Sequence, residues 1–550
     1  MSKIKIFALG GLNEDGKNMY VTKVDEDIFI FDAGLKYPQD RTLGVEYTIC
    51  DYRYLKENLK HIKGIFISHG HEANMGAVSD ILMEFGNRIP VYGSKFTLEI
   101  IKLQLQDDNV QEYKLIELKP HHKIDFGKNS IFPISVNHSI PESLCYVLNT
   151  EDGAIVYTGD FIFDPALKGN YAMDIGRLAY VGKQGVLCLM SESLFSSKKG
   201  FTSPKHRVSP FIKKVLYENP DRIIINVLPA HIFRIQEIFD EVSKTNRKIV
   251  IMGSYLQRLI NMSIENKYLR INPTKIGSLN DLNDKGIVVL TSDSKQNPFS
   301  NLERIIKGND KYIKLQETDT IFISEGMYEG VEKRMVQIMD DIAKMNIKVL
   351  SCNNKEYLLM HPSREDLMLM LNLTNPKYYF PVKGNYKDQY LNAEVAFDCG
   401  MEKENIILKQ NGDVAEFIDG KLTDEIDHVK VDEILIDGKS QEDIGELVLK
   451  DREMLAESGI VIVCATLNKE TKEIIAGPEI LTRGFIFVKD NIELLQEGQK
   501  ICTDVIQSVV VPNQRVDFKE ITNQIRDNLG RYFYQETEVR PIIITVIQEL

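Results

Sequence analysis

Short apolar runs alternate with segments of helical periodicity through the first half of the chain. A short apolar run bounded by turn residues is typical of a buried strand, whereas apolar positions three and four residues apart predict an amphipathic helix. The predicted strands are Ile4–Ala8, Ile28–Phe31, Gly64–Ser68 and Ala154–Thr158, and the predicted helices are Gly76–Phe85 and Phe96–Gln106. This alternation indicates an α/β domain.

The alternation restarts near Val208 and indicates a second, smaller α/β unit. Its predicted strands are Ile223–Leu228, Lys248–Met252 and Gly286–Thr291, and its predicted helix is Arg234–Lys244. Later segments predict a helix at Arg364–Leu373, a strand and turn at Tyr378–Tyr386, and strands at Ile460–Ala465, Gly484–Val488 and Ile542–Ile547. The last hundred or so residues mix strands with helices, which favours a separate α+β domain.

Length and composition favour a globular protein of several domains. The 550 residues are 43% hydrophobic and 27% charged, which excludes the disordered and fibrous classes. No apolar run approaches the ~20 residues that span a bilayer, and the first residues enter a strand pattern without a signal peptide. We therefore expect a cytoplasmic protein with no membrane partner. The seven cysteines include no Cys-x-x-Cys pair, so neither a disulfide framework nor a thiolate zinc site is indicated.

Charge is distributed unevenly along the chain. The formal net charge of −13 argues against a protein that binds nucleic acid through its overall electrostatic field. Any nucleic-acid site must therefore be a local basic surface. Residues 195–214 contain six Lys or Arg and no acid, and this basic run is either a solvated face or such a local surface. Residues 421–460 carry twelve acids against five bases, which indicates a solvated linker or domain boundary.

Two histidines follow a predicted buried strand, in the sequence Ser68-His69-Gly-His71. The carboxyl end of such a strand is where α/β folds place their ligands, and imidazoles at i and i+2 can face one cation. His138 and Asp160 also follow apolar, strand-like runs. Three imidazoles and one carboxylate form a plausible site for Zn²⁺ or Mn²⁺.

A series of motifs resembles the ribonuclease J family, in the β-CASP branch of the metallo-β-lactamase superfamily. The motifs run in order over most of the chain: Leu9-Gly-Gly11, Gly16-Lys-Asn18, Phe31-Asp32-Ala-Gly34, Tyr92-Gly-Ser94, Asp174-Ile-Gly-Arg-Leu178, Gly200-Phe-Thr202, Leu367-Met-Leu-Met-Leu-Asn372, Pro376-Lys-Tyr378, Gly477-Pro478 and Arg483-Gly-Phe485. Such an ordered set is far more specific than one His-x-His pair.

The resemblance implies an α/β fold class with several parts. A four-layer αβ/βα metallo-β-lactamase domain would be built from residues 1–207 and 351–425, interrupted by a β-CASP α/β domain at 208–350. An acidic linker at 426–445 would lead to a small C-terminal α+β oligomerisation domain at 446–550. The implied family activity is metal-dependent RNA cleavage, exonucleolytic from the 5′ end and also endonucleolytic.

The metal-binding motifs depart from the family pattern at three positions. The family motif His-x-His-x-Asp-His has Ala73 and Asn74 in its last two places, and Lys383 replaces the histidine of Pro-Val-His-Gly-Glu-Tyr. The resemblance assigns the first ion to His69, His71, His138 and Asp160, which are all present. The second ion loses every ligand except the shared Asp160.

All three replacements disfavour binding of a second metal ion. Alanine has no lone pair, asparagine offers a neutral oxygen, and a protonated lysine has no acceptor. An ammonium ~4 Å from a dication would repel it by roughly 8 kcal/mol at an effective dielectric of 20. We therefore expect one divalent metal at most, Zn²⁺ or Mn²⁺. Lys383 either supplies positive charge for a phosphate or forms a salt bridge with Asp160.

Other functional motifs of the family are altered as well. The RNA-side motif Phe-Ala-Ser-Asn-Ile-x-Arg corresponds to Leu228-Pro-Ala230-His231-Ile-Phe-Arg234, and the Gly-rich loop before Pro298 has lost its glycines. The motif Ser-Gly-His-Ala-Ser corresponds to Leu359-Met-His361-Pro-Ser363. The resemblance therefore implies catalytic roles for Asp160 and His361, and substrate contacts for His231, Arg234, His361 and Ser363.

Three functional hypotheses follow. The first is a weakly active or inactive ribonuclease J paralogue that binds RNA and supports an active paralogue as partner, in homo- or hetero-oligomers, during ribosomal RNA maturation and messenger turnover. The second is an active 5′–3′ exo- and endoribonuclease that uses one ion, with Glu72 or Asp164 supplying missing oxygen ligands. A small-molecule hydrolase is disfavoured, because the β-CASP insertion belongs to nucleic-acid enzymes.

Overall fold

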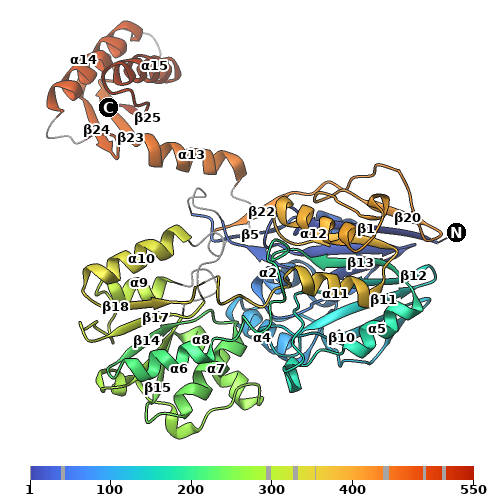
Figure 1. Cartoon of the computed structure of the whole chain (residues 1–550). Helices are drawn as coiled ribbons and strands as arrows, with labels where there is room; N and C mark the ends of the chain where they lie inside the picture. The colour runs from blue at the N-terminus through green and yellow to red at the C-terminus, as the bar shows by residue number, and fades with distance from the viewer. Residues whose placement is uncertain are drawn as a thin grey trace. The chain divides into compact units, whose positions relative to one another are not determined.

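The structure is a computed structural model that describes residues 2–38, 44–292, 299–325, 332–353, 355–437, 445–486, 491–510 and 516–550. The chain divides into two compact units (Figure 1). Among the described residues, the first unit takes residues 2–38 and 46–437, and the second takes residues 44–45 and those from 445 onward.

Two large sheets form the centre of the first unit. One has the strand order β21-β20-β1-β2-β3-β6-β7-β8 and the other β19-β13-β12-β11-β10-β9. The strands of the first sheet are β1 (Lys3–Gly10), β2 (Met19–Val24), β3 (Asp27–Phe31), β6 (Ile62–Phe66), β7 (Val91–Gly93), β8 (Leu115–Glu117), β20 (Ala415–Ile418) and β21 (Lys421–Leu422). Those of the second are β9 (Ile124–Phe126), β10 (Asn129–Ser135), β11 (Leu144–Thr150), β12 (Gly153–Tyr157), β13 (Val186–Glu192) and β19 (Tyr378–Val382).

The two sheets pack face to face, and helices cover their outer faces. Phe29, Phe31 and Phe66 of the first sheet share one buried core with Tyr146 and Tyr157 of the second. Opposite faces of the same strands pack against helices in two further cores. The helices are α3 (Val78–Phe85) and α4 (Lys95–Asp107) on the first sheet, and α5 (Ile175–Gln184), α11 (Arg364–Thr374) and α12 (Tyr386–Asp398) on the second. The arrangement is the expected four-layer αβ/βα sandwich.

A parallel sheet of order β15-β16-β14-β17-β18 is inserted between β13 and β19. Helices α6, α7 and α8 pack on one face, and α9 and α10 on the other (Figure 1). The strands are β14 (Ile223–Asn226), β15 (Ile249–Met252), β16 (Val288–Thr291), β17 (Thr320–Ile323) and β18 (Lys348–Ser351). The helices are α6 (Ser209–Glu218), α7 (Ile232–Ser243), α8 (Ser254–Glu265), α9 (Ser300–Ile306) and α10 (Glu332–Lys344).

Part of the segment predicted as an acidic linker is ordered strand. β22 (Glu433–Ile436) pairs antiparallel with β5 (Tyr47–Cys50), which pairs in turn with β4 (Leu35–Lys36). The short helices α1 (Arg53–Glu57) and α2 (Glu72–Met75) complete the first unit. The strand forms despite its acidic context because Ile436 is buried and the Glu433 carboxylate lies 2.5 Å from the Lys17 ammonium. Residues 438–444 of the predicted linker lie outside the described residues.

The second unit is a small α+β fold. Strand β23 (Ile460–Leu467) lies between β24 (Ile474–Arg483), which is antiparallel to it, and β25 (Ile542–Glu549), which is parallel. Its alternate residues, including Val461 and Val463, share a core with α14 (Ile492–Val509) and α15 (Phe518–Thr537). Helix α13 (Gly445–Ser458) precedes the sheet.

The predicted helices and strands coincide with observed elements in most places, with two differences. The strand predicted at Gly484–Val488 is wrong for residues 484–486, because β24 ends at Arg483 and Gly484 has a left-handed φ of 70°. Residues 487 and 488 lie outside the described part of the chain. The strand and turn predicted at Tyr378–Tyr386 correspond to β19 and the residues that follow it, except that Tyr386 is already the first residue of α12. Among the described residues, no helix combines the length and the apolar character that a membrane crossing requires.

Replacing Phe66 by alanine should destabilise the first unit strongly. The Phe66 ring is fully buried between the sheets and stacks on Tyr92 at 4.6 Å, so its loss leaves a cavity. We expect the free energy of unfolding, measured by urea denaturation with circular dichroism, to fall by about 3–5 kcal/mol. The control is Tyr180→Ala, at a side chain that is 56% exposed, with an expected change within about 0.5 kcal/mol. Equal losses of stability in both variants would contradict a core role for Phe66.

Candidate metal and nucleic-acid site

Three histidines and one aspartate converge where several strands end. His69 and His71 follow β6, His138 follows β10, and Asp160 follows β12. One ligand atom from each of these four residues lies within 4.8 Å of all the others. Helix α2 packs closely on the loop that follows β3, since a Cβ on Gly34 would lie 1.7 Å from the Ala73 carbonyl oxygen. The four residues proposed for the first ion are therefore brought together by the fold.

Hydrogen bonds behind the histidines orient their lone pairs toward one point. The His138 Nδ1–H donates to the Met360 carbonyl oxygen at 2.8 Å, and His69 Nδ1 lies 2.9 Å from the Ser68 hydroxyl. The Nε2 atoms of both rings then face Nδ1 of His71, at 2.9 and 3.0 Å. Burial, followed by the neighbouring His69, lowers the pKa of His71 and of His138 well below the usual value. Neutral imidazoles with convergent lone pairs are suited to a metal ion.

The buried carboxylate of Asp32 organises the loops behind the histidines. It accepts hydrogen bonds from the Ser68 amide at 2.6 Å, the Ser68 hydroxyl at 2.8 Å, the Asn74 amide at 2.7 Å and the Tyr157 hydroxyl at 2.5 Å. Because the Ser68 hydroxyl donates to Asp32, it is free to accept from His69 Nδ1–H. Burial raises the pKa of Asp32, and the neighbouring His69, followed by the donors of Asn74, the Ser68 backbone and Tyr157, opposes that rise. In the sequence, Asp32 stands out only as part of the motif Phe31-Asp32-Ala-Gly34. Its position directly after β3 was a further signal of a site residue.

Lys383 and Asp160 form a buried ion pair. The ammonium lies 2.5 Å from Asp160 Oδ2, and the two side chains are 5% and 1% exposed. The backbone of Lys383 has a left-handed φ of 57°, and its amide donates to the Gly11 carbonyl at 2.9 Å. Burial would raise the pKa of Asp160, but Lys383 and then His69 hold it well below the usual range. Of the two alternatives for Lys383, the salt bridge is the geometry observed.

A second cluster is formed by Asp160, Glu192 and His361, whose ligand atoms also lie within 4.8 Å of one another. His361 Nδ1 lies 2.8 Å from Glu192 Oε2 and 3.8 Å from Asp160 Oδ2. Burial would lower the pKa of His361, but Glu192 and then Asp160 raise it above its usual value, which favours the cationic form of the histidine. Glu192 was missing from the predicted site, although its place as the last residue of the buried strand β13 was a signal for a site residue.

The predicted substrate-side residues have structural partners. His231 Nδ1 lies 2.8 Å from Glu325 Oε2, and the Arg234 guanidinium donates to Glu237 at 3.0 Å. Ser363 is the N-cap residue of α11: its side chain is fully buried, its amide donates to Asp366 at 3.0 Å, and its hydroxyl lies 2.8 Å from the Thr202 hydroxyl. These three side chains are thus engaged with structural partners, whereas His361 lies in the second cluster, with Asp160 and Glu192. Residues 293–298 of the altered Gly-rich loop lie outside the described residues.

Glu72 and Asp164 do not join either cluster among the described residues. Glu72 accepts a hydrogen bond from the Tyr37 hydroxyl at 2.5 Å. Asp164 is bound by Arg207 at 2.6 Å and lies 3.2 Å from His206. The one-ion hypothesis therefore cannot draw its missing oxygen ligands from these two carboxylates in this geometry.

The residues fit one metal ion and do not fit two. Three imidazoles face one another, and Asp160 Oδ1 is buried with no hydrogen-bond partner among the described residues. His69, His71, His138 and Asp160 would hold that ion, which supplies Lewis acidity and lowers the pKa of bound water. At the second position, Ala73 has no donor atom, the Asn74 amide nitrogen donates to Asp32, and Lys383 brings a positive charge.

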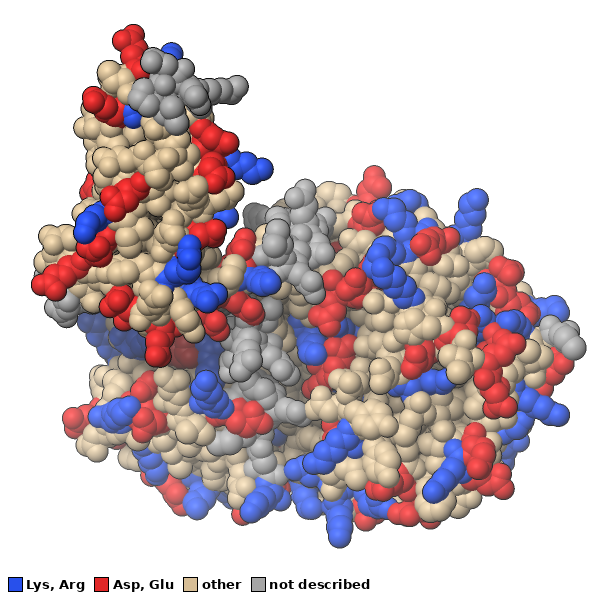
Figure 2. Space-filling view, turned by 90° about the horizontal axis from the view of Figure 1, so that it is seen from above, with Lys and Arg blue, Asp and Glu red and all other residues tan. Residues whose placement is uncertain are grey.

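The basic run at 195–214 lies on the surface. Arg207 is occupied by Asp164, and Lys198 lies over the Phe195 ring at 5.6 Å. Lys199, Lys205, Lys213 and Lys214 are exposed, and none has an acidic partner within the described residues. Elsewhere acidic and basic side chains are interspersed, as the face shown in Figure 2 illustrates. The run is therefore a local positive surface on an acidic protein.

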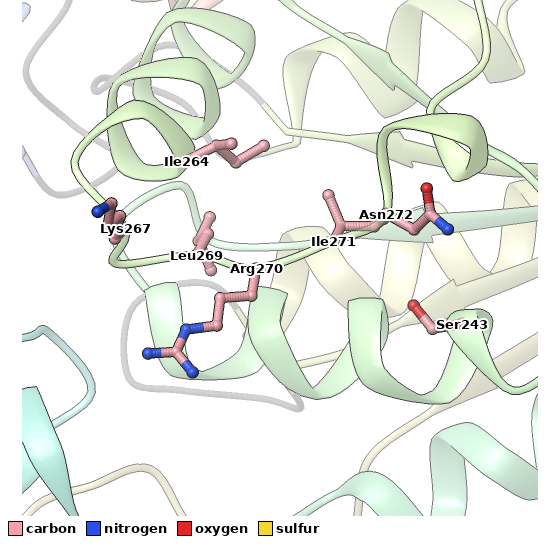
Figure 3. Close-up of a pocket in the computed structure, with 7 residues that line it drawn as sticks. All are labelled: Ser243, Ile264, Lys267, Leu269, Arg270, Ile271 and Asn272. Carbon is pink, nitrogen blue, oxygen red and sulfur yellow. The ribbon is translucent and has the colours of Figure 1, made fainter.

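A depression of about 600 Å³ lies on the inserted domain, away from the histidine cluster. It is lined by Ser243, Ile264, Lys267, Leu269, Arg270, Ile271 and Asn272, from the end of α7, from α8 and from the segment that follows α8 (Figure 3). It is wide open and contains no cluster of metal-ligating or nucleophilic side chains among these residues. We assign no chemistry to it.

The fold and the cluster place the chain in a known structural class. A four-layer αβ/βα sandwich, with a His-x-His pair at its strand ends and a parallel-sheet domain inserted between two strands, is a metallo-β-lactamase fold of the β-CASP type. A family model described as "Ribonuclease J, beta-CASP domain" matches residues 220–342, and one described as "Ribonuclease J C-terminal domain" matches residues 447–550.

The chain belongs to the ribonuclease J family. "Ribonuclease J2" of Bacillus subtilis is 34% identical over 554 residues, which covers 100% of this chain and 99% of the relative. "Ribonuclease J 2" of Staphylococcus epidermidis is 33% identical over 551 residues, covering 100% and 98%. Within the family, the chain is thus similar to the second paralogue. A crystal structure of a protein of unknown function from Enterococcus faecalis, 17% identical with a TM-score of 0.53, covers 76% of this chain and all of its own, and shares the fold alone.

Replacing Tyr157 by phenylalanine should destabilise the loops behind the histidines. The change deletes the hydroxyl that donates to Asp32 at 2.5 Å and leaves a buried carboxylate with one donor fewer. We expect the free energy of unfolding to fall by about 1–3 kcal/mol in urea denaturation. Tyr180→Phe is the matched control, because that hydroxyl belongs to an exposed ring. A decrease no larger than that of the control would show that Asp32 does not depend on this bond.

Proposed function

We propose that the protein is a weakly active or inactive ribonuclease J paralogue, which binds RNA in cytoplasmic ribosomal RNA maturation and messenger turnover. The observation that carries the proposal is the Lys383–Asp160 ion pair, at the position where the family's second ion would need ligands. Two-metal hydrolysis relies on both ions to clamp the displaced phosphate, so a site that fits one ion should be slow by orders of magnitude.

In this proposal, Asp160 and His361 keep the catalytic positions without a complete metal centre. His231, Arg234 and Ser363 shape the wall on the substrate side. RNA is held by the exposed lysines of the basic run, because a phosphate backbone needs a local positive surface on a chain of net charge −13. An active ribonuclease J paralogue is the proposed partner, with the C-terminal domain at residues 446–550 taking part in homo- or hetero-oligomers.

The second candidate is an active ribonuclease that uses one ion. The three convergent imidazoles and the free Oδ1 of Asp160 favour it, since one ion has a suitable ligand set. It requires that a single ion both activates water and places the phosphate.

The two candidates are separated by cleavage of a 5′-monophosphorylated RNA with Mn²⁺ or Mg²⁺. We expect the purified chain to bind the RNA and to cleave it at a trace rate that Asp160→Ala does not change. Cleavage that Asp160→Ala abolishes would establish the one-ion enzyme and overturn the weakly active or inactive paralogue. Absence of RNA binding would contradict both.

The double variant Lys199→Ala/Lys205→Ala should weaken RNA binding in a salt-dependent way. Each lysine–phosphate interaction that the variant removes should reduce the slope of log K against log salt by about 0.7 for a single strand. The measurement is fluorescence anisotropy with a labelled oligonucleotide across a salt series. Lys128→Ala/Lys403→Ala, at exposed lysines outside the run, is the charge-matched control and should leave the slope unchanged. Equal effects of the two double variants would exclude the basic run as the RNA surface.

A further inference from the structure

Lys383 is the nearest neighbour of the carboxylate that the family shares between two ions. Its ammonium lies 2.5 Å from Asp160 Oδ2, whereas His69 Nε2, His138 Nε2 and His361 Nδ1 lie at 3.4, 3.7 and 3.8 Å from the same oxygen. The ammonium reaches this place from the end of β19, and the left-handed backbone of Lys383 is held by Gly11. The fold therefore directs one specific cation to this oxygen.

Each carboxylate of the two clusters faces a basic side chain. Asp160 is paired with Lys383 at 2.5 Å, and Glu192 with His361 at 2.8 Å. All four side chains are buried or nearly so. A buried carboxylate without a counter-charge costs several kcal/mol, and metal sites of this kind ordinarily obtain that charge from the ions. Here the protein carries the counter-charges in its own side chains.

We propose that Lys383 is an internal cation that replaces the metal charge at Asp160 and keeps the site folded without an ion. The same ammonium repels any ion that enters the three-histidine site, so it also weakens binding of the single ion that the ligands still fit. Lys383 is then a positioning residue, which acts through Asp160. The inference rests on the proposed function only for the role of the site in RNA binding, and its test contains no RNA.

The test compares the full chain with Lys383→Met, which keeps the length of the side chain and removes its charge. Tm is measured in EDTA and with Mn²⁺, and the Mn²⁺ dissociation constant is measured by calorimetry. We expect the Tm of the unaltered chain to change little between EDTA and Mn²⁺. In EDTA, the Tm of Lys383→Met should be roughly 5 °C below that of the unaltered chain, and Mn²⁺ should restore most of this difference. The variant should bind Mn²⁺ at least about tenfold more tightly than the unaltered chain.

Two further variants keep the proposal testable if Lys383→Met fails to fold in EDTA. Lys383→Arg retains the charge, so its Tm should resist EDTA as that of the unaltered chain does. Lys383→Met/Asp160→Asn removes both charges, so it should regain Tm in EDTA relative to Lys383→Met and should not gain the tighter Mn²⁺ binding.

The matched control is Lys17→Met, because Lys17 is another buried lysine paired with acids, at 3.3 Å from Glu14 and 2.5 Å from Glu433. Its Tm should fall in EDTA without recovery in Mn²⁺. The proposal is overturned if Mn²⁺ raises the Tm of the unaltered chain as much as that of Lys383→Met. It is also overturned if Lys383→Met neither regains Tm with Mn²⁺ nor binds Mn²⁺ more tightly. Where Lys383→Met does not fold, a Tm of Lys383→Arg that falls in EDTA and recovers with Mn²⁺ overturns it. The RNA experiments above fail or succeed independently of this result.

Discussion

The ion pair between Lys383 and Asp160 joins the two parts of the sandwich domain that the inserted domain separates in sequence. Asp160 follows β12 in the first part, and Lys383 follows β19 in the second. The parallel pairing of β12 with β13 and of β13 with β19 brings both strand ends to one edge of the sheet. A lysine and an aspartate buried at that edge require each other, because either charge alone would be costly to bury. The histidine cluster is arranged around this pair.

The support behind the cluster comes from a different buried carboxylate. Asp32 receives four donors from Ser68, Asn74 and Tyr157, and through Ser68 it fixes the ring of His69. Asn74 replaces a family metal ligand, and its amide is used to hold Asp32 instead. The support behind the histidines is thus present, and in the proposal above Lys383 provides the charge that an ion would bring.

The α/β units could be predicted from the sequence because their signals are local, whereas the family, the sandwich fold and the inserted domain were implied by the resemblance of motifs spread along the chain. The runs around β1, β3 and β12 are apolar, and the helical periodicity at α4 and α7 extends over several turns. The strand predicted at Gly484–Val488 was wrong because an apolar pattern continues past a glycine whose left-handed φ ends the strand. The ordered strand β22 was missed because its acidic context hides its pairing with β5 and its ion pair with Lys17, both with residues far away in the chain.

For the site, the residue types alone establish which ligands are present: three histidines and Asp160 remain, while Ala73, Asn74 and Lys383 stand where others are expected. Chemical identity is a property of each residue, so it needs no fold. The folded chain was needed to show that Lys383 pairs with Asp160, 223 positions away, that Ser363 is buried as a helix cap, and that Asp164 is held by Arg207. These interactions join strand ends and loops far apart in sequence, and the packing of the sheets selects them rather than any local pattern.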